Sequence, residues 1–211
     1  VVDNSPGGAA PVPFPIDVKE LTRSSPVVVR LYVIRATGLA SLDGGNSSDP
    51  YLVASLGETT FKCREEVVKA TLKPYFGQVF EFETTMPGPT QLKLAVYDWD
   101  MIGKDDLIGA TTIDLEDRFF SPEWRALSRP VSHSGGTPQP CWPIESRTLR
   151  DTGSFKSRGK VECWVDILHK ADARANPVID IAMAPPEEFE LRVLLYKTRG
   201  LPIMDTSSGT N

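Results

Sequence analysis

The chain has 211 residues, of which 40% are hydrophobic, and its 28 acidic residues outnumber 23 basic ones to give a net charge of −5. This length favours one globular domain with extensions, or one and a half domains. The acidic balance argues against a general nucleic-acid-binding protein, which needs a surplus of positive charge to neutralise phosphates. No apolar run approaches the roughly 18 residues of a membrane-spanning helix.

The beginning of the chain predicts a linker over residues 1–25. This stretch is rich in proline and glycine, which prevent regular helices and strands. It has neither the basic start nor the apolar centre of a signal peptide, and it does not begin with Met. We therefore expect a piece of a longer protein.

The three cysteines favour an intracellular setting. Cys63, Cys141 and Cys163 are odd in number and have no C-x-x-C spacing. This pattern predicts reduced, buried thiols rather than a disulfide framework or a zinc site.

Short runs of β-type residues, separated by turn signals, fill the chain from residue 26 to residue 170. Eight such runs in one domain predict an all-β fold, an eight-stranded antiparallel β-sandwich. The predicted strands cover residues 27–36, 51–57, 58–65, 78–84, 91–98, 107–115, 141–145 and 160–168.

Residues 116–140 interrupt the strand pattern and predict a short helical insertion. In the stretch EDRFFSPEWRALS, Ser121 is a suitable N-cap and Pro122 suits the first helical position. The following VSHSGGTPQP has the composition of a loop.

The end of the chain contains an internal repeat. After a predicted second linker at 171–188, the stretch LRVLLYKTRGLPIMD (191–205) aligns without a gap on VRLYVIRATGLASLD (29–43). A repeated strand with its following loop predicts that residues 189–211 are the truncated first strand and loop of a second copy of the domain. Chance similarity between two amphipathic strands is the alternative.

Two acidic loops follow predicted strands. Asp43 and Asp49 lie six residues apart in the first, and Asp100 and Asp106 repeat that step in the second, just after Asp98. Loops that follow alternate strands of an antiparallel sandwich gather at one end, so these five carboxylates are predicted to converge. Converging carboxylates repel one another unless a cation neutralises them.

The predicted cation is Ca²⁺, which accepts about six to eight oxygen ligands in a tolerant geometry. Mg²⁺ demands a tighter octahedron, and Zn²⁺ prefers His or Cys, which neither loop contains. The backbone carbonyls of Leu42 and Trp99 are further candidate ligands. Ordinary turn chemistry is the better explanation of a single acidic loop, because Asp is common in turns, but it explains two loops with the same spacing poorly.

The second acidic loop has an apolar tip. Met101 and Ile102 stand between charged residues, followed by Gly103 and Lys104. We predict that Met101, Ile102 and Lys104 contact a membrane once calcium offsets the local negative charge. The alternative is that one of the apolar side chains folds back onto the sandwich.

Four basic residues near the predicted third strand form a weaker candidate site. Lys62 and Arg64 alternate on one strand face, with Lys69 and Lys73 nearby. They predict a contact with an anionic lipid headgroup. A solvated strand face is the simpler interpretation, because two glutamates follow Arg64 directly.

Residues 27–168 resemble the C2 domain, a calcium- and phospholipid-binding β-sandwich. LASLDGGNSSDPYLVASLG is similar to its first metal loop and LAVYDWDMIGKDDLIGATTIDL to its third, and all five family aspartates fall on Asp residues here. TLKPYFGQVFEFE resembles a third family stretch, although Gly77 and Gln78 replace its Asn-Glu. GKVECWVDIL, a strand that opens many C2 domains, stands last, which implies the second, circularly permuted C2 topology.

The stretch DDLIGATTIDLEDRFFSPEW further resembles the ferlins, multi-C2 proteins of membrane fusion and repair. The resemblance implies a calcium-dependent phospholipid-binding module of a fusion, vesicle-trafficking or repair protein, at the cytoplasmic face of membranes. It implies an anionic membrane, neighbouring C2 domains and fusion-machinery proteins as partners, and a C-terminal transmembrane anchor outside this chain.

Two other functions remain as alternatives. A protein-interaction or structural C2 domain would bind calcium weakly or not at all. A metal-dependent phosphodiesterase would need a general base or nucleophile beside the metal. The first acidic loop contains no His, Cys or Lys-paired Ser, and the second contains only Lys104. We therefore expect a binding module rather than an enzyme.

Overall fold

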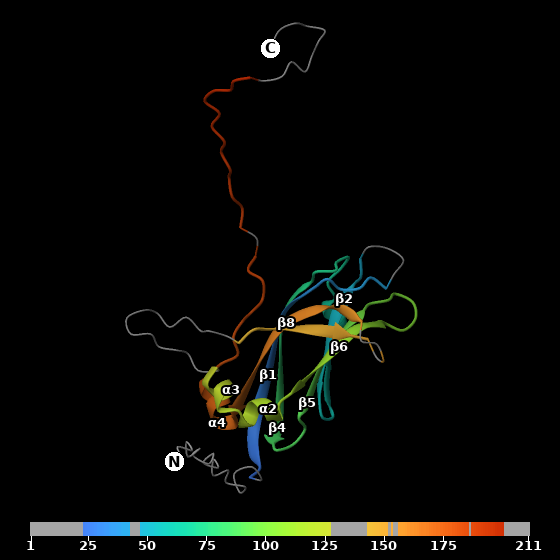
Figure 1. Cartoon of the computed structure of the whole chain (residues 1–211), viewed down its shortest axis with the longest axis vertical. Helices are drawn as coiled ribbons and strands as arrows, with labels where there is room; N and C mark the ends of the chain where they lie inside the picture. The colour runs from blue at the N-terminus through green and yellow to red at the C-terminus, as the bar shows by residue number, and fades with distance from the viewer. Residues whose placement is uncertain are drawn as a thin grey trace, which may run out of the picture.

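The computed structural model describes residues 23–42, 47–127, 143–151, 153, 156–185 and 187–200. Eight strands form an antiparallel sandwich (Figure 1), as predicted, with the hydrogen-bonded order β3-β2-β5-β6-β7-β8-β1-β4. The strands are β1 (Ser25–Thr37), β2 (Pro50–Leu56), β3 (Thr59–Lys62), β4 (Tyr75–Met86), β5 (Gln91–Asp98), β6 (Asp106–Asp114), β7 (Glu145–Arg150) and β8 (Ser157–His169).

The last strand lies beside the first. β8 pairs with β1 along almost its whole length and with β7 on its other edge. GKVECWVDIL, the strand that opens many C2 domains, lies in β8 here, as the last strand and between β1 and β7, which is the permuted connectivity that the sequence implied. The strand order therefore confirms the second topology.

The predicted helical insertion is confirmed as two short helices, α2 (Glu116–Phe120) and α3 (Pro122–Leu127). Ser121 precedes α3, and its hydroxyl accepts a hydrogen bond from the Trp124 backbone N–H at 3.3 Å, as expected of an N-cap. In Figure 1 both helices lie at one end of the sandwich, together with a further helix, α4 (Lys170–Ala175). A 3₁₀ turn, η1 (Arg64–Glu66), shortens the predicted third strand.

The seventh strand is a correction. It was predicted over residues 141–145, but the structure places β7 at Glu145–Arg150. Pro143 lacks the N–H that a strand interior needs. The sequence pattern does not reveal β7, because Leu149 is its one fully buried residue and the strand has no alternating apolar pattern.

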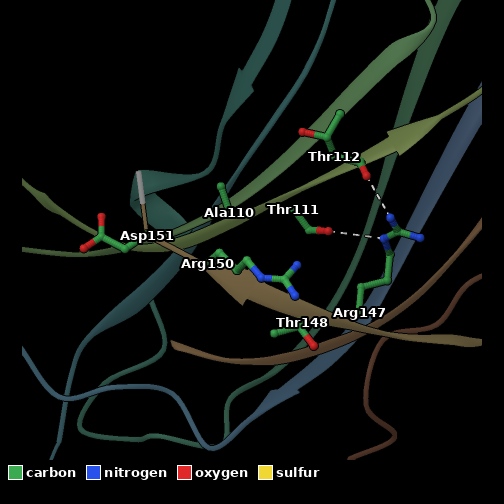
Figure 2. A pocket seen from close by; sticks show the side chains of 7 residues that line it. All are labelled: Ala110, Thr111, Thr112, Arg147, Thr148, Arg150 and Asp151. Atoms are coloured by element: carbon green, nitrogen blue, oxygen red, sulfur yellow. Dashed lines mark hydrogen bonds between the residues drawn. The ribbon is translucent and has the colours of Figure 1, made fainter. Parts of the chain in front are cut away.

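β6 and β7 form the seam between the two layers. They share one paired position, Ala110 opposite Arg150, and then diverge. The divergence leaves an open groove of about 380 Å³ (Figure 2). Arg147 lies across this groove and donates to the Thr111 hydroxyl at 3.3 Å and to the Thr112 carbonyl at 2.7 Å, so side-chain contacts replace part of the missing strand pairing.

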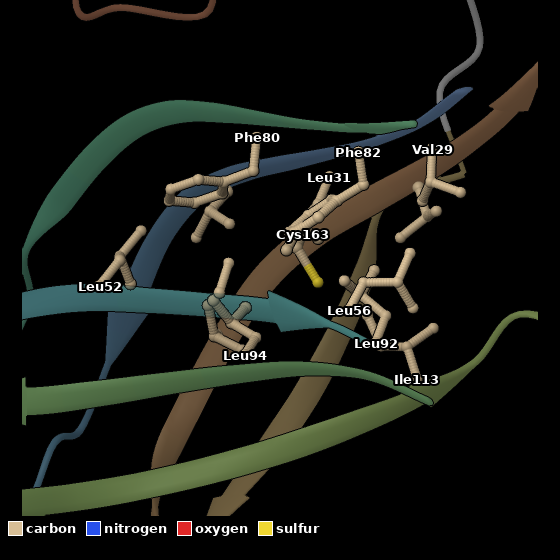
Figure 3. Packing of buried hydrophobic residues seen from close by; sticks show 14 of the residues in the cluster. Val29, Leu31, Leu52, Leu56, Phe80, Phe82, Leu92, Leu94, Ile113 and Cys163 are labelled. Carbon is tan, nitrogen blue, oxygen red and sulfur yellow. The ribbon is translucent and has the colours of Figure 1, made fainter. Parts of the chain in front are cut away.

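The core fills the space between the layers (Figure 3). Alternate residues of each strand point inward, which is the period of two that a half-buried strand requires. Each buried aliphatic side chain of this kind contributes about 1.5–3 kcal/mol. Prominent members from both layers are Val29, Leu31, Leu52, Leu56, Phe80, Phe82, Leu92, Leu94, Ile113 and Cys163.

The outward-facing residues of β1 and β8 are buried as well. Arg30, Tyr32 and Trp164 point away from the core, yet each is at most 5% exposed. They are covered by residues 170–182, which we call the covering segment. Arg30 donates to the backbone carbonyls of this segment, and the Tyr75 hydroxyl donates to the Ile181 carbonyl at 2.8 Å.

Most of the stretch predicted as a linker, 171–188, is therefore in contact with the sandwich as far as residue 182. The reason is the outer face of β1 and β8, where Tyr32 and Trp164 stack with centroids 4.2 Å apart and would otherwise be exposed. Sequence patterning does not reveal this cover, because its contacts are made mainly by backbone carbonyls.

Residues 187–200 extend away from the sandwich (Figure 1) and include no strand. Their apolar side chains are exposed, with Phe189 at 84%, Leu191 at 88% and Tyr196 at 92%. Residues 201–211 lie outside the described part of the chain, and so do residues 1–22 of the linker predicted over residues 1–25, whereas Ser25 already belongs to β1. That residues 189–211 belong to a second copy of the domain stays a prediction.

Candidate functional site

The two acidic loops lie at the same end of the sandwich, opposite the helices. β1 ends at this end and β2 begins there, while the loop of residues 99–105 joins β5 to β6. The strand register pairs Pro50 with Asp98, and Asp98 with Asp106. Asp43 lies outside the described residues, so its place relative to the other four carboxylates stays a prediction.

Asp98 is the most buried of these carboxylates, with 2% of its surface exposed. Its Oδ1 accepts a hydrogen bond from the Asp49 backbone N–H at 2.7 Å. Its Oδ2 is buried and has no hydrogen-bond partner. A buried carboxylate oxygen without a donor carries a large desolvation cost, which a nearby positive charge would offset.

Asp49 faces two donors from the segment that follows η1. Its Oδ1 accepts from the Ala70 backbone N–H at 2.7 Å, and its Oδ2 accepts from the Lys69 ammonium at 3.0 Å. The hydrogen bond from Ala70, followed by the contact with Lys69, lowers the pKa of Asp49. The carboxylate is therefore ionised and already partly neutralised.

Trp99 connects the two loops. Its backbone N–H donates to the Asp49 carbonyl at 3.0 Å, which holds the first residue after β5 against the residue before β2. Asp100 follows, half-buried, and Asp106 is exposed at the start of β6. Leu42 packs its side chain against the core. Within residues 23–42 and 47–127 and the other described stretches, no three His, Cys, Asp or Glu side chains form a ready-made metal group.

Asp105 has a role that differs from that of the other acidic residues. It accepts two hydrogen bonds from Arg64, at 2.7 and 2.9 Å, and one from the Tyr51 hydroxyl at 2.8 Å. The hydrogen bond from Arg64 is the largest cause of a strong lowering of the Asp105 pKa. Burial and the same carboxylate raise the pKa of Tyr51. Asp105 thus attaches the end of the 99–105 loop to β2 and to the start of η1.

The spacing of the acidic residues does not reveal this role. Asp105 has the same local sequence character as Asp106, but its partners lie 54 and 41 residues away in the chain. Arg64 was a candidate for headgroup binding, and the structure instead places its guanidinium on Asp105 and on the Asp100 carbonyl. A fixed bidentate pair of this kind gives Arg64 a role in orienting the loop rather than in binding a lipid headgroup.

The other basic candidates are distributed around Arg64. Lys62 lies 3.5 Å from Asp105 with about half of its side chain exposed, and Lys69 contacts Asp49. Lys73 is exposed. These positions do not form one unpaired basic patch, because two of the three lysines already have carboxylate partners.

The tip of the 99–105 loop is open to solvent. Met101 is 80% exposed and Ile102 is 90% exposed, so neither side chain folds back onto the sandwich. Lys104 is exposed beside them. Two large apolar side chains at a loop tip, rimmed by charged residues, are typical of an interaction surface.

Two of the three cysteines lie in the described part of the chain. Cys163 is buried and Cys63 half-buried, and both are free thiols. Burial raises the pKa of Cys163 to about 12 and that of Cys63 to about 11, so neither is a reactive thiolate at neutral pH. Cys141 lies outside the described residues. In the described stretches no helix is long and apolar enough to cross a membrane.

Two solved structures similar to this chain contain C2 domains. A C2 domain of plant extended synaptotagmin 1 is 26% identical, with a TM-score of 0.48, over 67% of this chain and 94% of that one. A calcium-bound structure of two C2 domains of extended synaptotagmin 2 is 25% identical, with a TM-score of 0.49, over 67% of this chain and 45% of that one.

Comparison with sequences is more specific. A family model described as C2 domain matches residues 27–130. Mouse Fer-1-like protein 4 is 42% identical over a 265-residue alignment that covers 86% of this chain, and human myoferlin is 27% identical over 277 residues that cover 96%. The chain spans 13% of the length of each of these relatives. Together with the permuted sandwich and its acidic end, these matches show that the chain carries a C2 domain and belongs to the ferlin family.

Proposed function

We propose that this domain docks to anionic phospholipid membranes in response to calcium. The membrane-facing end is the one formed by Asp49, Asp98 and the loop of residues 99–105. Calcium held there leaves coordination positions that lipid phosphate oxygens can fill. Each ligand then raises the affinity for the other, as thermodynamic linkage requires.

The single observation that carries the proposal is the buried, partnerless Oδ2 of Asp98. A hard divalent cation satisfies such an oxygen. The other candidate ligand atoms are carboxylate and carbonyl oxygens, which suit Ca²⁺. The residues that would hold the ion are those derived from the sequence: Asp43, Asp49, Asp98, Asp100 and Asp106, with the backbone carbonyls of Leu42 and Trp99.

The exposed tip supplies the hydrophobic part of docking. Met101 and Ile102 are largely exposed at the tip, and Lys104 beside them favours an anionic surface. Burying one such apolar side chain in the acyl–headgroup boundary contributes about 1.5–3 kcal/mol. Without calcium, the nearby carboxylates repel an anionic surface and oppose this insertion.

The second candidate function is a structural or protein-interaction domain that binds calcium weakly. The observation that favours it is the Lys69 ammonium on Asp49, which already neutralises one of the expected ligands. Both candidates describe a binding module. Neither needs the nucleophile or general base that a metal-dependent phosphodiesterase would require.

The wider setting follows from the ferlin relatives and is equally a proposal. The domain works at the cytoplasmic face of membranes, within a longer protein whose C-terminal helix anchors it outside this chain. Its partners are anionic phospholipid, neighbouring C2 domains and fusion-machinery proteins. Residues 189–211 are the truncated first strand and loop of one of these neighbouring C2 domains.

Calorimetric titration of calcium, with and without vesicles that contain phosphatidylserine, tests the proposal. We expect saturable calcium binding that becomes tighter with anionic vesicles and disappears in Asp98→Asn with Asp100→Asn. Wild-type protein that binds no calcium would favour the structural alternative.

The matched control separates calcium binding from insertion. Met101→Ser with Ile102→Ser leaves every expected ligand in place, so its calcium affinity without vesicles should equal that of the wild type. Its vesicle affinity at saturating calcium should fall at least tenfold, given about 1.5 kcal/mol or more for each apolar side chain. Equal vesicle binding by the double variant would place the membrane contact elsewhere.

A further inference from the structure

Lys69 occupies the place of a counter-ion at the acidic end. Its ammonium lies 3.0 Å from Asp49 Oδ2 and 3.5 Å from the centre of the Trp99 ring. It therefore interacts at once with an expected metal ligand from the first loop and with a residue of the second. About half of its side chain remains exposed, so the ammonium can leave without disturbing the core.

The backbone beside Lys69 is shaped for this contact. Ala70 has a positive φ of 52°, which is costly for a residue with a Cβ. This conformation directs the Ala70 N–H at Asp49 Oδ1, 2.7 Å away, while Lys69 reaches Oδ2. Strain of this kind persists when the surrounding contacts require it, so the segment is fitted to the Asp49 carboxylate.

The neighbouring basic residues are not equivalent. Arg64 and Lys62 both face Asp105, which attaches the loop to the sandwich. Lys73 forms no ion pair within the described part of the chain. Lys69 is thus the lysine of this segment whose charge is directed at an expected calcium ligand.

We propose that Lys69 is an intramolecular counter-ion that a divalent cation must displace from Asp49, and that the released ammonium then binds an anionic lipid phosphate. The inference rests on the proposed function and adds a residue that sets the calcium threshold. A cation and the ammonium cannot both occupy the Asp49 carboxylate without strong repulsion. Displacement moves a positive charge from the site towards the surface that calcium recruits.

The proposal predicts effects of opposite sign for one substitution. Lys69→Met keeps the aliphatic stem and removes the charge. Without vesicles it should bind calcium about tenfold more tightly, because neither an exposed ion pair nor a cation–π contact has to be broken. At saturating calcium it should bind phosphatidylserine vesicles about fivefold more weakly, because one lysine near an anionic surface is lost.

Lys73→Met is the matched control, since it also removes one lysine charge, at a position four residues further along the chain. It should lower vesicle affinity no more than Lys69→Met does and leave calcium affinity without vesicles close to that of the wild type. An equal gain in calcium affinity for both variants would show a general change of field and overturn the counter-ion role.

A metal-free measurement tests the contact by itself. Lys69→Met should alter the tryptophan emission of the calcium-free protein, and Trp99→Phe should remove that difference. If the wild type binds no calcium, the proposed function fails even when this emission change is present. If the wild type binds calcium and Lys69→Met binds it equally well, the proposed function stands and the counter-ion role is overturned.

Discussion

Asp166 is an unfavourably placed charge, and replacing it should stabilise the protein. It lies on β8 directly opposite Arg30 of β1 in the strand register. The Arg30 guanidinium nevertheless bonds to Glu81 and to the carbonyls of Ala173 and Asn176 in the covering segment. Asp166 is 7% exposed and its Oδ1 has no hydrogen-bond partner.

Burial is the main cause that raises the pKa of Asp166 to about 6, while a hydrogen bond from Trp164 and the charge of Arg30 act in the opposite direction. The reference value is 3.8, so the rise is about 2 pKa units, or about 3 kcal/mol at about 1.4 kcal/mol per unit. Between pH 3.8 and about pH 6, Asp166 binds more protons in the folded protein than in the unfolded chain. The stability contributed by this one group is therefore fully present below pH 3.8 and is lost as the pH rises through about 6.

The substitution Asp166→Asn removes this ionisation while keeping the shape. At pH 7.5 we expect the variant to be more stable than the wild type by up to about 3 kcal/mol, with a smaller gain if its amide lacks an acceptor. Near pH 4 the two proteins should be equally stable.

Urea denaturation followed by circular dichroism at several pH values between 4 and 8 measures the difference. Asp117→Asn, at an exposed position of α2, is the matched control and should change stability little at any pH. If Asp166→Asn were no more stable than the wild type at pH 7.5, and both had the same pH dependence, the carboxylate would be solvated or paired. The reasoning from its burial would then be refuted.

Two further predictions concern the supports of the acidic end and of the outer face. Asp105→Asn should lower the melting temperature by several degrees and weaken calcium binding, because the Arg64 fork loses its carboxylate; unchanged calorimetric and thermal scans would contradict the role of Asp105 in attaching the loop. A chain shortened to end at residue 183 should unfold at the same urea concentration as the full chain, whereas one ending at residue 169 should be less stable by about 2 kcal/mol or more. The shorter chain leaves the Arg30 donors without their carbonyls and uncovers the outer aromatic face, and equal stability of the two shortened chains would show that the covering segment contributes nothing.

Local patterns in the sequence were sufficient for most strands of the sandwich, although not for β7. β5 was predicted at its observed bounds, because Leu92, Leu94 and Val96 alternate with outward-facing residues and satisfy the period of a half-buried strand. Ser121 and Pro122 likewise marked the start of α3, since N-cap chemistry depends on neighbours within one turn. The permuted topology followed from the resemblance of the last strand to the strand that opens many C2 domains, and the structure pairs that strand with β1.

Long-range contacts decided the rest. The sequence alone placed the acidic loops at one end and determined which carboxylates are candidates for calcium. It did not separate Asp105, which supports the loop, from Asp98, whose Oδ2 is buried without a donor. That distinction depends on which distant side chain reaches each carboxylate, and spacing along one strand carries no information about a partner 41 residues away. The contacts of Lys69 and of the covering segment also depend on the tertiary structure. The Lys69 ammonium reaches the Trp99 ring, and Arg30 reaches the Ala173 carbonyl, only once the sandwich has formed.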